Sequence, residues 1–190
     1  MFCYQCQETA KGTGCTIRGV CGKTDDVACL QDLLIYTLKG ISVFTLKAKE
    51  KDLNTDKADK FIVDSLFSTI TNANFSKQSF IERIKEALFI RKECIELLDN
   101  NDVVIGDLPD ATTWTAATEV EFDQKAKEVG VLRTENEDVR SLRELVTYGV
   151  KGIAAYTHHA FVLNYEDNEI YKFIEKALEA TLDDSLSADA

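Results

Sequence analysis

The sequence predicts an all-α protein in which two related helical bundles follow a cysteine-rich N-terminal loop. Three observations lead to this prediction: a single proline in 190 residues, apolar spacing of helical period in six stretches, and an internal repeat at an offset of 112 residues. No stretch alternates apolar and polar residues convincingly, as a half-buried strand would. We therefore expect helices after residues 1–28.

The predicted helices are marked by apolar residues that recur every three or four positions. In the first of them, Leu30, Leu33, Leu34, Leu38 and Ile41 share one face. The six stretches cover residues 30–41, 61–70, 80–98, 122–129, 142–153 and 170–178. The third is expected to start near residue 76 and to continue to about residue 99.

The start of the fifth helix carries a capping pattern. Thr134 is followed three residues later by Glu137, so that the hydroxyl and the carboxylate could satisfy free backbone amides. Asp138 adds negative charge near the positive end of the helix dipole. We interpret Glu135, Glu137 and Asp138 as residues of this helix start rather than as a catalytic carboxylate pair.

The repeat aligns two helical pairs. The stretch LQDLLIYTLKGISVFTLKA (30–48) matches LRELVTYGVKGIAAYTHHA (142–160) at eight of 19 positions, and residues 60–70 match residues 172–182 at five of 11. We interpret this as a duplicated unit, with a first bundle of three helices over 29–112 and a second bundle over 113–190. The copy of the third helix would begin near residue 188, so the second bundle is expected to be truncated before its last helix, unless the copy diverged. Its uncovered apolar stripe could then mediate a homo-oligomer.

Two glycines occupy matched positions inside the repeated helices. Gly40 and Gly152 each cost about 1 kcal/mol relative to alanine at such a position. A close helix crossing would explain both, and a tolerated relic of the duplication is the alternative. Residues 100–115 are the expected connection between the units, and we expect Trp114 there to be a packed anchor.

Composition restricts the function. Acidic residues outnumber basic ones by 33 to 22, giving a net charge of −11, and no basic run is present. Binding to a nucleic acid is therefore not expected, because a polyanion requires clustered Lys and Arg. We identify no apolar run that approaches the roughly 18 residues of a membrane span, and no signal-peptide pattern opens the chain. We expect a cytoplasmic protein without a membrane partner, whose thiols stay reduced.

The opening stretch MFCYQCQETAKGTGCTIRGVC holds four of the six cysteines, in the pattern C-x2-C-x8-C-x5-C. Thiolates at Cys3, Cys6, Cys15 and Cys21 could bind an iron–sulfur cluster or a tetrahedral zinc ion. Zinc ribbons generally use two C-x2-C pairs and this loop has one, so the spacing favours the cluster; disulfides are the weakest alternative. Arg18 and Lys23 lie beside these residues, either as cations that raise a cluster's reduction potential or as ordinary solvated charges.

The remaining candidates have simpler explanations. Cys29 and Cys94 fall on predicted helices, where free cysteines usually act as small buried apolar residues. His158 and His159 are adjacent on a helix and point about 100° apart, so they are poorly placed to ligate one metal ion. We expect one of them to be packed and the other to be solvated.

The N-terminal stretch MFCYQCQETAKGTGCTIRGVCGK resembles that of the hybrid-cluster proteins, also called prismane proteins or hydroxylamine reductases. LQDLLIYTLKGI, TITNANF and TENEDVRSLREL are similar to the same family, so the resemblance covers essentially the whole chain. It implies a helical N-terminal domain of two three-helix bundles. It also implies that Cys3, Cys6, Cys15 and Cys21 hold a [4Fe–4S] cluster. Carbon monoxide dehydrogenases have a similar helical region, but the opening motif fits hybrid-cluster proteins better.

The chain departs from that family in length. Family members are roughly three times longer, and the resemblance implies that later domains hold their catalytic hybrid iron–sulfur–oxygen cluster. Its ligands have no positions here, so we assign no catalytic residue. The expected function is that of an electron-transfer region that receives electrons from a redox donor and relays them to the missing domains, where hydroxylamine or nitric oxide is reduced. A freestanding electron carrier and a zinc-stabilised helical interaction module are the alternatives.

Overall fold

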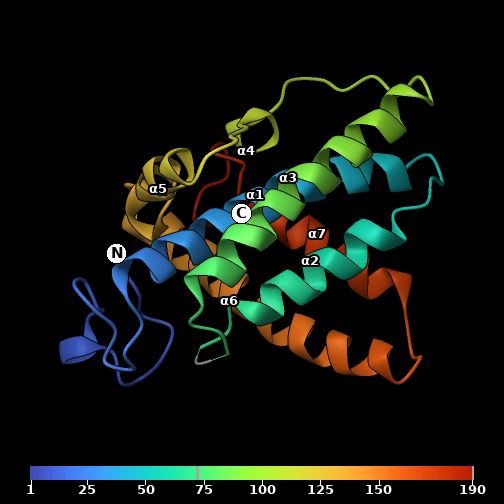
Figure 1. Cartoon of the computed structure of the whole chain (residues 1–190). Helices are drawn as coiled ribbons and strands as arrows, with labels where there is room; N and C mark the ends of the chain where they lie inside the picture. Colours follow the sequence, from blue (N-terminus) through green and yellow to red (C-terminus); the bar gives the residue numbers. More distant parts are fainter. Residues whose placement is uncertain (72, 190) are drawn as a thin grey trace.

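The computed structural model describes residues 1–71 and 73–189, and within them the chain is all-α. Seven α-helices are joined by short loops, and no strand occurs in these two ranges (Figure 1). The prediction of an all-α fold is therefore confirmed. The helices are α1 (Asp25–Lys49), α2 (Asp56–Ser68), α3 (Lys77–Asp99), α4 (Asp110–Thr113), α5 (Glu119–Glu128), α6 (Glu137–Val162) and α7 (Asn168–Ala180).

Helix α1 is the centre of the core. It packs against α3 most extensively and also against α7, α4, α5 and α2. Leu33, Leu38 and Phe44 are fully buried although they do not all lie on one face. A helix that is apolar on all sides is stable only when other elements surround it, which explains this position.

The apolarity of α1 corrects one expectation from the sequence. By length and composition α1 could cross a membrane, although we expected no apolar run of that length. In the fold, 83% of its most apolar 18-residue window is buried. The expectation failed because isolated polar residues interrupt the apolar run, yet the mean hydropathy of the helix stays high enough for a membrane span. Packing against the other helices accounts for the apolar composition of this helix.

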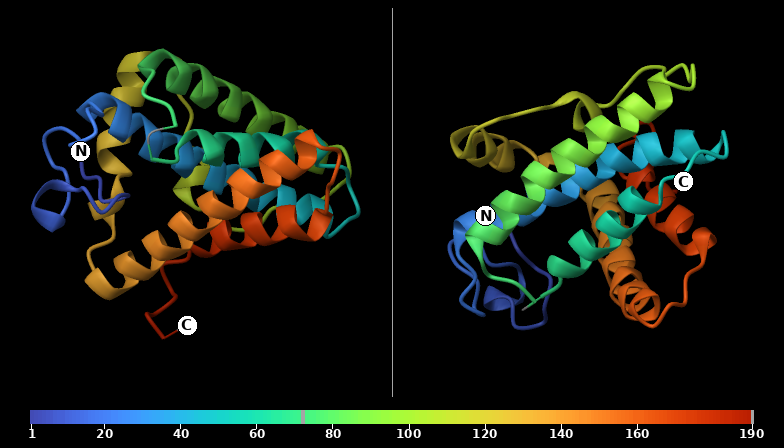
Figure 2. Two further views of the ribbon diagram at one scale, coloured as in Figure 1. Left: turned by 90° about the horizontal axis from the view of Figure 1, so that it is seen from below. Right: turned by 45° about the vertical axis from the view of Figure 1, so that its right-hand side comes forward.

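The helices of the two repeats have matching bounds. Adding 112 to the bounds of α1 gives 137–161, and α6 covers Glu137–Val162. The same shift places α2 on 168–180, which are the bounds of α7. Helices α6 and α7 run side by side, and they also pack across the repeat, α6 on α2 and α7 on α1 (Figure 2). The buried apolar residues of both units thus form one continuous core. The division into residues 1–28, 29–112 and 113–190 remains a prediction.

The two repeats differ in how much of their apolar surface is covered. Residues of α1 and α2 that are buried have apolar counterparts on α6 and α7 that are exposed. We call these exposed residues the α6/α7 face: Leu142, Leu145, Val146, Tyr148, Tyr156, Ile170 and Phe173. The contrast in exposed fraction is clear for Leu33 (0%) and Leu145 (66%), for Phe44 (0%) and Tyr156 (81%), and for Phe61 (8%) and Phe173 (56%).

The helix starts agree only partly with the predicted caps. Helix α3 begins near residue 76, as predicted, and Ser76 caps it, since its hydroxyl accepts a hydrogen bond from the Ser79 amide (3.2 Å). The capping box predicted at Thr134 and Glu137 is wrong. Asn136 caps α6 instead, because its side chain is one residue from the first turn and accepts from two amides there. A capping box does occur at α5, which begins after Thr118.

The matched glycines lie in different surroundings. A Cβ atom on Gly40 would stand 2.0 Å from the carbonyl oxygen of Ala111, so α1 and α4 approach as closely as glycine allows. The predicted close crossing is confirmed there. A Cβ atom on Gly152 would meet nothing within 4 Å, so the same explanation is wrong for this glycine. The difference arises because the connection carrying α4 covers α1 and no described segment covers α6 in the same way.

The connection over residues 100–115 is held onto the core. Arg91 of α3 is buried and donates to the carbonyl oxygens of Ala111 (2.9 Å) and Trp114. The Trp114 ring lies against Tyr36 and Phe122, with centroids 6.5 and 6.2 Å away. The expected role of Trp114 as a packed anchor is confirmed.

Candidate metal centre

The N-terminal loop brings Cys3 and Cys15 together. Their backbones form an antiparallel bridge, in which the Cys3 amide donates to the Cys15 carbonyl (3.0 Å) and the Cys15 amide donates to the Cys3 carbonyl (2.7 Å). Gly14 precedes Cys15 with a φ of +136°, and a Cβ atom there would lie 2.6 Å from the Phe2 ring. Glycine is therefore required for the chain to turn into the bridge.

Cys6 and Cys21 occupy two separate turns of the same loop. The Cys6 carbonyl accepts from the Thr9 amide (3.2 Å), and the Cys6 side chain is half-buried. Cys21 is exposed in a turn closed by the Gly19 amide, which donates to the Lys23 carbonyl (2.8 Å). All four predicted ligands thus lie in one irregular loop, at the end of the bundle where α1 begins (Figure 2).

The Cys15 thiol has the most developed surroundings. It is buried and accepts a hydrogen bond from the Ala10 amide (3.4 Å), and the Thr9 hydroxyl lies 3.6 Å away. These contacts, led by the Ala10 amide, lower the pKa of the Cys15 thiol, with smaller contributions from the Val20 backbone and the Lys23 charge. Because the thiolate is the metal-binding form, Cys15 is prepared to act as a ligand.

The donor set fits an iron–sulfur cluster, although the side chains are not gathered around one point. All six cysteines are free, so none of the four is consumed by a disulfide. In the part of the chain that the structure describes, no three Cys, His, Asp or Glu side chains converge on a position for a single metal ion. The fit therefore rests on four free thiols in one loop and on the N–H donor to Cys15.

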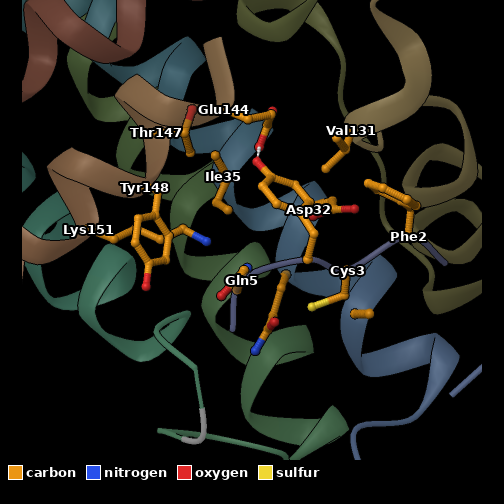
Figure 3. Close-up of a pocket in the computed structure, with 13 residues that line it drawn as sticks. Phe2, Cys3, Gln5, Asp32, Ile35, Val131, Glu144, Thr147, Tyr148 and Lys151 are labelled. Atoms are coloured by element: carbon orange, nitrogen blue, oxygen red, sulfur yellow. Dashed lines mark hydrogen bonds between the residues drawn. The ribbon is translucent and has the colours of Figure 1, made fainter. Parts of the chain in front are cut away.

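Several polar contacts fasten the loop to the helices. The Tyr4 hydroxyl donates to Glu144 of α6 (3.0 Å), and Glu144 lines the cavity that also contains Cys3 (Figure 3). The Lys23 ammonium donates to Gln31 of α1 (2.6 Å). The Thr71 hydroxyl donates to the Gln5 carbonyl (3.4 Å). The loop is thereby connected to both repeats.

The cavity beside Cys3 is also lined by charged side chains. Asp32 of α1 and Lys151 of α6 line it together with Cys3 and Glu144 (Figure 3). Removal from water raises the pKa of Asp32 and lowers the pKa of Lys151, because each loses hydration in its charged form. Each of the two charges partly offsets the effect of burial on the other.

The other candidate side chains, two cysteines and two histidines, lie on the helices of the bundle. Cys94 is buried, and burial raises the pKa of its thiol to about 12. Cys29 is half-buried at the start of α1, and burial raises its pKa as well. His158 is half-buried with Nδ1 2.6 Å from Asp64 Oδ1, whereas His159 is exposed. The prediction that one histidine is packed and the other solvated is confirmed.

A model of the Prismane/CO dehydrogenase family matches residues 1–190. The chain belongs to the Prismane/CO dehydrogenase family. Curated relatives in this family include hydroxylamine reductases of Thermoanaerobacter pseudethanolicus (57% identical over 189 residues), Desulfitobacterium hafniense (57% over 190) and Clostridium novyi (58% over 190). Each alignment covers 100% of this chain but only 34–35% of the relative, so the chain spans about a third of their length.

Membership of the prismane family confirms the resemblance read from the opening motif. The relatives are named hydroxylamine reductases, which are oxidoreductases.

The burial of Lys23 and Lys151 beside the loop, at 2% and 4% exposure, was not predicted from the sequence. The retained KGI triplet at residues 39–41 and 151–153 was a signal that Lys151 is constrained. Arg18 is exposed, so of the two cations beside the cysteines only Arg18 is an ordinary solvated charge.

Proposed function

We propose that this chain is the N-terminal electron-transfer region of a hydroxylamine reductase-like protein. A [4Fe–4S] cluster bound by Cys3, Cys6, Cys15 and Cys21 would supply one-electron redox chemistry. The single observation that carries the proposal is the set of four free thiols in one loop, with Cys15 buried and receiving an N–H donor. Family membership over the whole chain supports it.

Different residues of the chain position and stabilise different parts of the proposed metal centre. The Cys3–Cys15 bridge keeps two ligands adjacent, and Gly14 permits the turn that brings them there. The Tyr4–Glu144 bond fixes the loop against α6. The Ala10 amide favours the thiolate at Cys15 and so helps to retain metal. None of these residues is placed to do bond chemistry, and we propose that this segment alone is not catalytic.

In the longer protein, electrons from a redox donor would pass through this region to a hybrid iron–sulfur–oxygen cluster held by later domains. The whole protein would combine hydroxylamine with two electrons and two protons to give ammonia and water, or would reduce nitric oxide. We place the protein in the cytoplasm, where cysteine thiols stay reduced.

We further propose that the α6/α7 face is covered by a later segment of the longer protein. Its counterparts on α1 and α2 are covered, chiefly by α3, and the repeat offset places the copy of α3 on residues 189–211. A second copy of the chain is the other candidate for the same surface. Apolar side chains as exposed as Leu145 and Tyr156 are typical of such contacts.

Metal and sulfide analysis of the anaerobically purified chain tests the proposal. We expect about four irons and a matching amount of sulfide per chain, with a broad absorption band at about 400 nm that dithionite bleaches. Serine replacement of all four loop cysteines should abolish bound iron. Iron that survives those replacements would overturn the proposal. A colourless protein with one zinc ion would establish the zinc-stabilised module instead, and a native product of this length with a stable cluster would indicate a freestanding carrier.

A further inference from the structure

Two lysines are buried next to the cysteine loop. Lys23 is 2% exposed and Lys151 is 4% exposed. Lysine is almost never buried to this degree unless an opposite charge pairs with it, because an ammonium group loses its hydration inside a protein. The position of the negative charge that pairs with these two lysines therefore indicates what they interact with.

Each of these lysines has a neutral partner. The Lys23 ammonium donates to the amide oxygen of Gln31 (2.6 Å). The Gln5 amide, oriented to satisfy both of its neighbours, accepts from Lys151 (3.0 Å) and donates to the Thr69 carbonyl (3.2 Å). Neither lysine forms an ion pair with any carboxylate in residues 1–71 and 73–189. An amide oxygen stabilises an ammonium group but leaves its charge uncompensated.

The surrounding charges do not neutralise the pair. Asp32 and Glu144 act on Lys151 only over distances longer than an ion pair, and Lys23 itself repels Lys151. On α1, Lys39 adds another positive charge near Asp32. The remaining source of negative charge at this position is the cysteine loop, which both lysines adjoin.

The geometry connects each lysine to one part of the loop. The point where a Cβ of Gly19 would stand is 3.0 Å from the Cys21 sulfur and 3.1 Å from Lys23 Cβ, so Lys23 belongs to the same turn as Cys21. Lys151 lines the cavity that also contains Cys3, and its side chain extends from α6 toward Gln5 (Figure 3). The Lys23 side chain therefore runs from the loop to α1, where its ammonium meets Gln31, and the Lys151 ammonium reaches the loop from α6.

We propose that Lys23 and Lys151 are the buried counter-charges of an anionic metal–thiolate cluster held by Cys3, Cys6, Cys15 and Cys21. This inference rests on the proposed function, since it requires that cluster. Both lysines are positioning residues that act through the cluster's charge. Their electrostatic effect favours the more negative, reduced form, and the low polarity around them makes the effect stronger than that of a solvated cation.

The test compares four variants of the full chain: Lys23→Met, Lys151→Met, Lys23→Arg, and Arg18→Met as the control for a solvated loop cation. The reduction potential is measured by anaerobic titration with dithionite, together with iron and sulfide content. We expect Lys23→Met and Lys151→Met each to lower the equilibrium constant for reduction about tenfold or more, which is a shift of about 59 mV or more to lower potential. Lys23→Arg should restore most of the potential, and Arg18→Met should change it much less.

The thermal midpoint of the metal-free chain gives a second readout that does not need the cluster. Without the cluster, Lys23→Met removes an uncompensated buried charge and should melt at a higher temperature than the parent chain. In the chain that holds the cluster, the increase in melting temperature caused by Lys23→Met should be smaller or should become a decrease. A parent chain without iron and sulfide would refute the proposed function. If the parent chain holds the cluster but neither methionine substitution changes its reduction potential, this inference alone is refuted.

Discussion

Asp59 of α2 and Glu175 of α7 share one ammonium group, that of Lys49 at the end of α1, at 2.9 and 2.6 Å. Both carboxylates are buried, and each retains one oxygen without a hydrogen-bond partner among the described residues. Two negative charges facing one positive charge in a buried site favour a proton on one of the acids. This cluster joins the two repeats on the side of the core away from the cysteine loop.

The shared cluster predicts that stability depends on pH. Burial, followed by the contact with Asp59, raises the pKa of Glu175 from 4.5 to about 8. The folded protein therefore binds a proton that the unfolded chain releases between these values, and stability should fall as pH rises from about 5 to about 8. Thermal melting across this range measures the effect.

Glu175→Gln should flatten this pH dependence and raise stability at pH 8 by on the order of 1 kcal/mol. Glu169→Gln, in the exposed first turn of the same helix, is the control and should leave the slope as it is. If the pH dependence of stability is the same in Glu175→Gln as in the parent chain, other groups cause it.

The matched glycines predict opposite effects of the same substitution. Gly40→Ala places a methyl group against the Ala111 carbonyl oxygen and should destabilise the fold by about 1–3 kcal/mol. Gly152→Ala adds a methyl group in open space and should stabilise α6 by about 0.5–1 kcal/mol. Urea unfolding of the two variants measures both values, and equal effects would contradict the close crossing at Gly40.

The cysteines outside the loop should be dispensable for metal. Cys94→Ser introduces a hydroxyl at a buried position and should destabilise the fold by about 1–3 kcal/mol while leaving the iron content unchanged. Cys29→Ser, at a half-buried position, should have a smaller effect on stability and none on iron. Iron loss in either variant, with the fold intact by circular dichroism, would add that cysteine to the ligand set.

The α6/α7 face should make the isolated chain self-associate. Leu145→Glu and Tyr156→Glu introduce charge into this face without touching the buried core, so both should shift the chain toward the monomer. Sedimentation velocity at several concentrations measures the shift. Gln124→Glu, an exposed substitution on α5, adds the same single negative charge and is the control. A parent chain that is already monomeric would show that this face does not pair copies of the chain.

Local patterns were sufficient for the helices and insufficient for the surroundings of the cysteines. The spacing of apolar residues located six helices, since burial of one face governs which residues recur. The cap of α6 was misplaced because Thr134 and Asn136 are both acceptable capping residues and backbone geometry decides between them. The neutral partner of Lys151 is Gln5, far away in the sequence, so no local pattern could identify this contact, although the repeated KGI triplet indicated that the lysine is constrained.

The central place of α1 has a consequence for how the chain comes apart. This helix contributes its surface to α3 of its own repeat and to α7 of the other, so neither repeat has a complete interior without it. Denaturation should accordingly be cooperative, with both repeats melting in one transition. Cleavage within residues 100–115 would not yield two autonomous modules, because the C-terminal piece would lose the helix on which α7 rests.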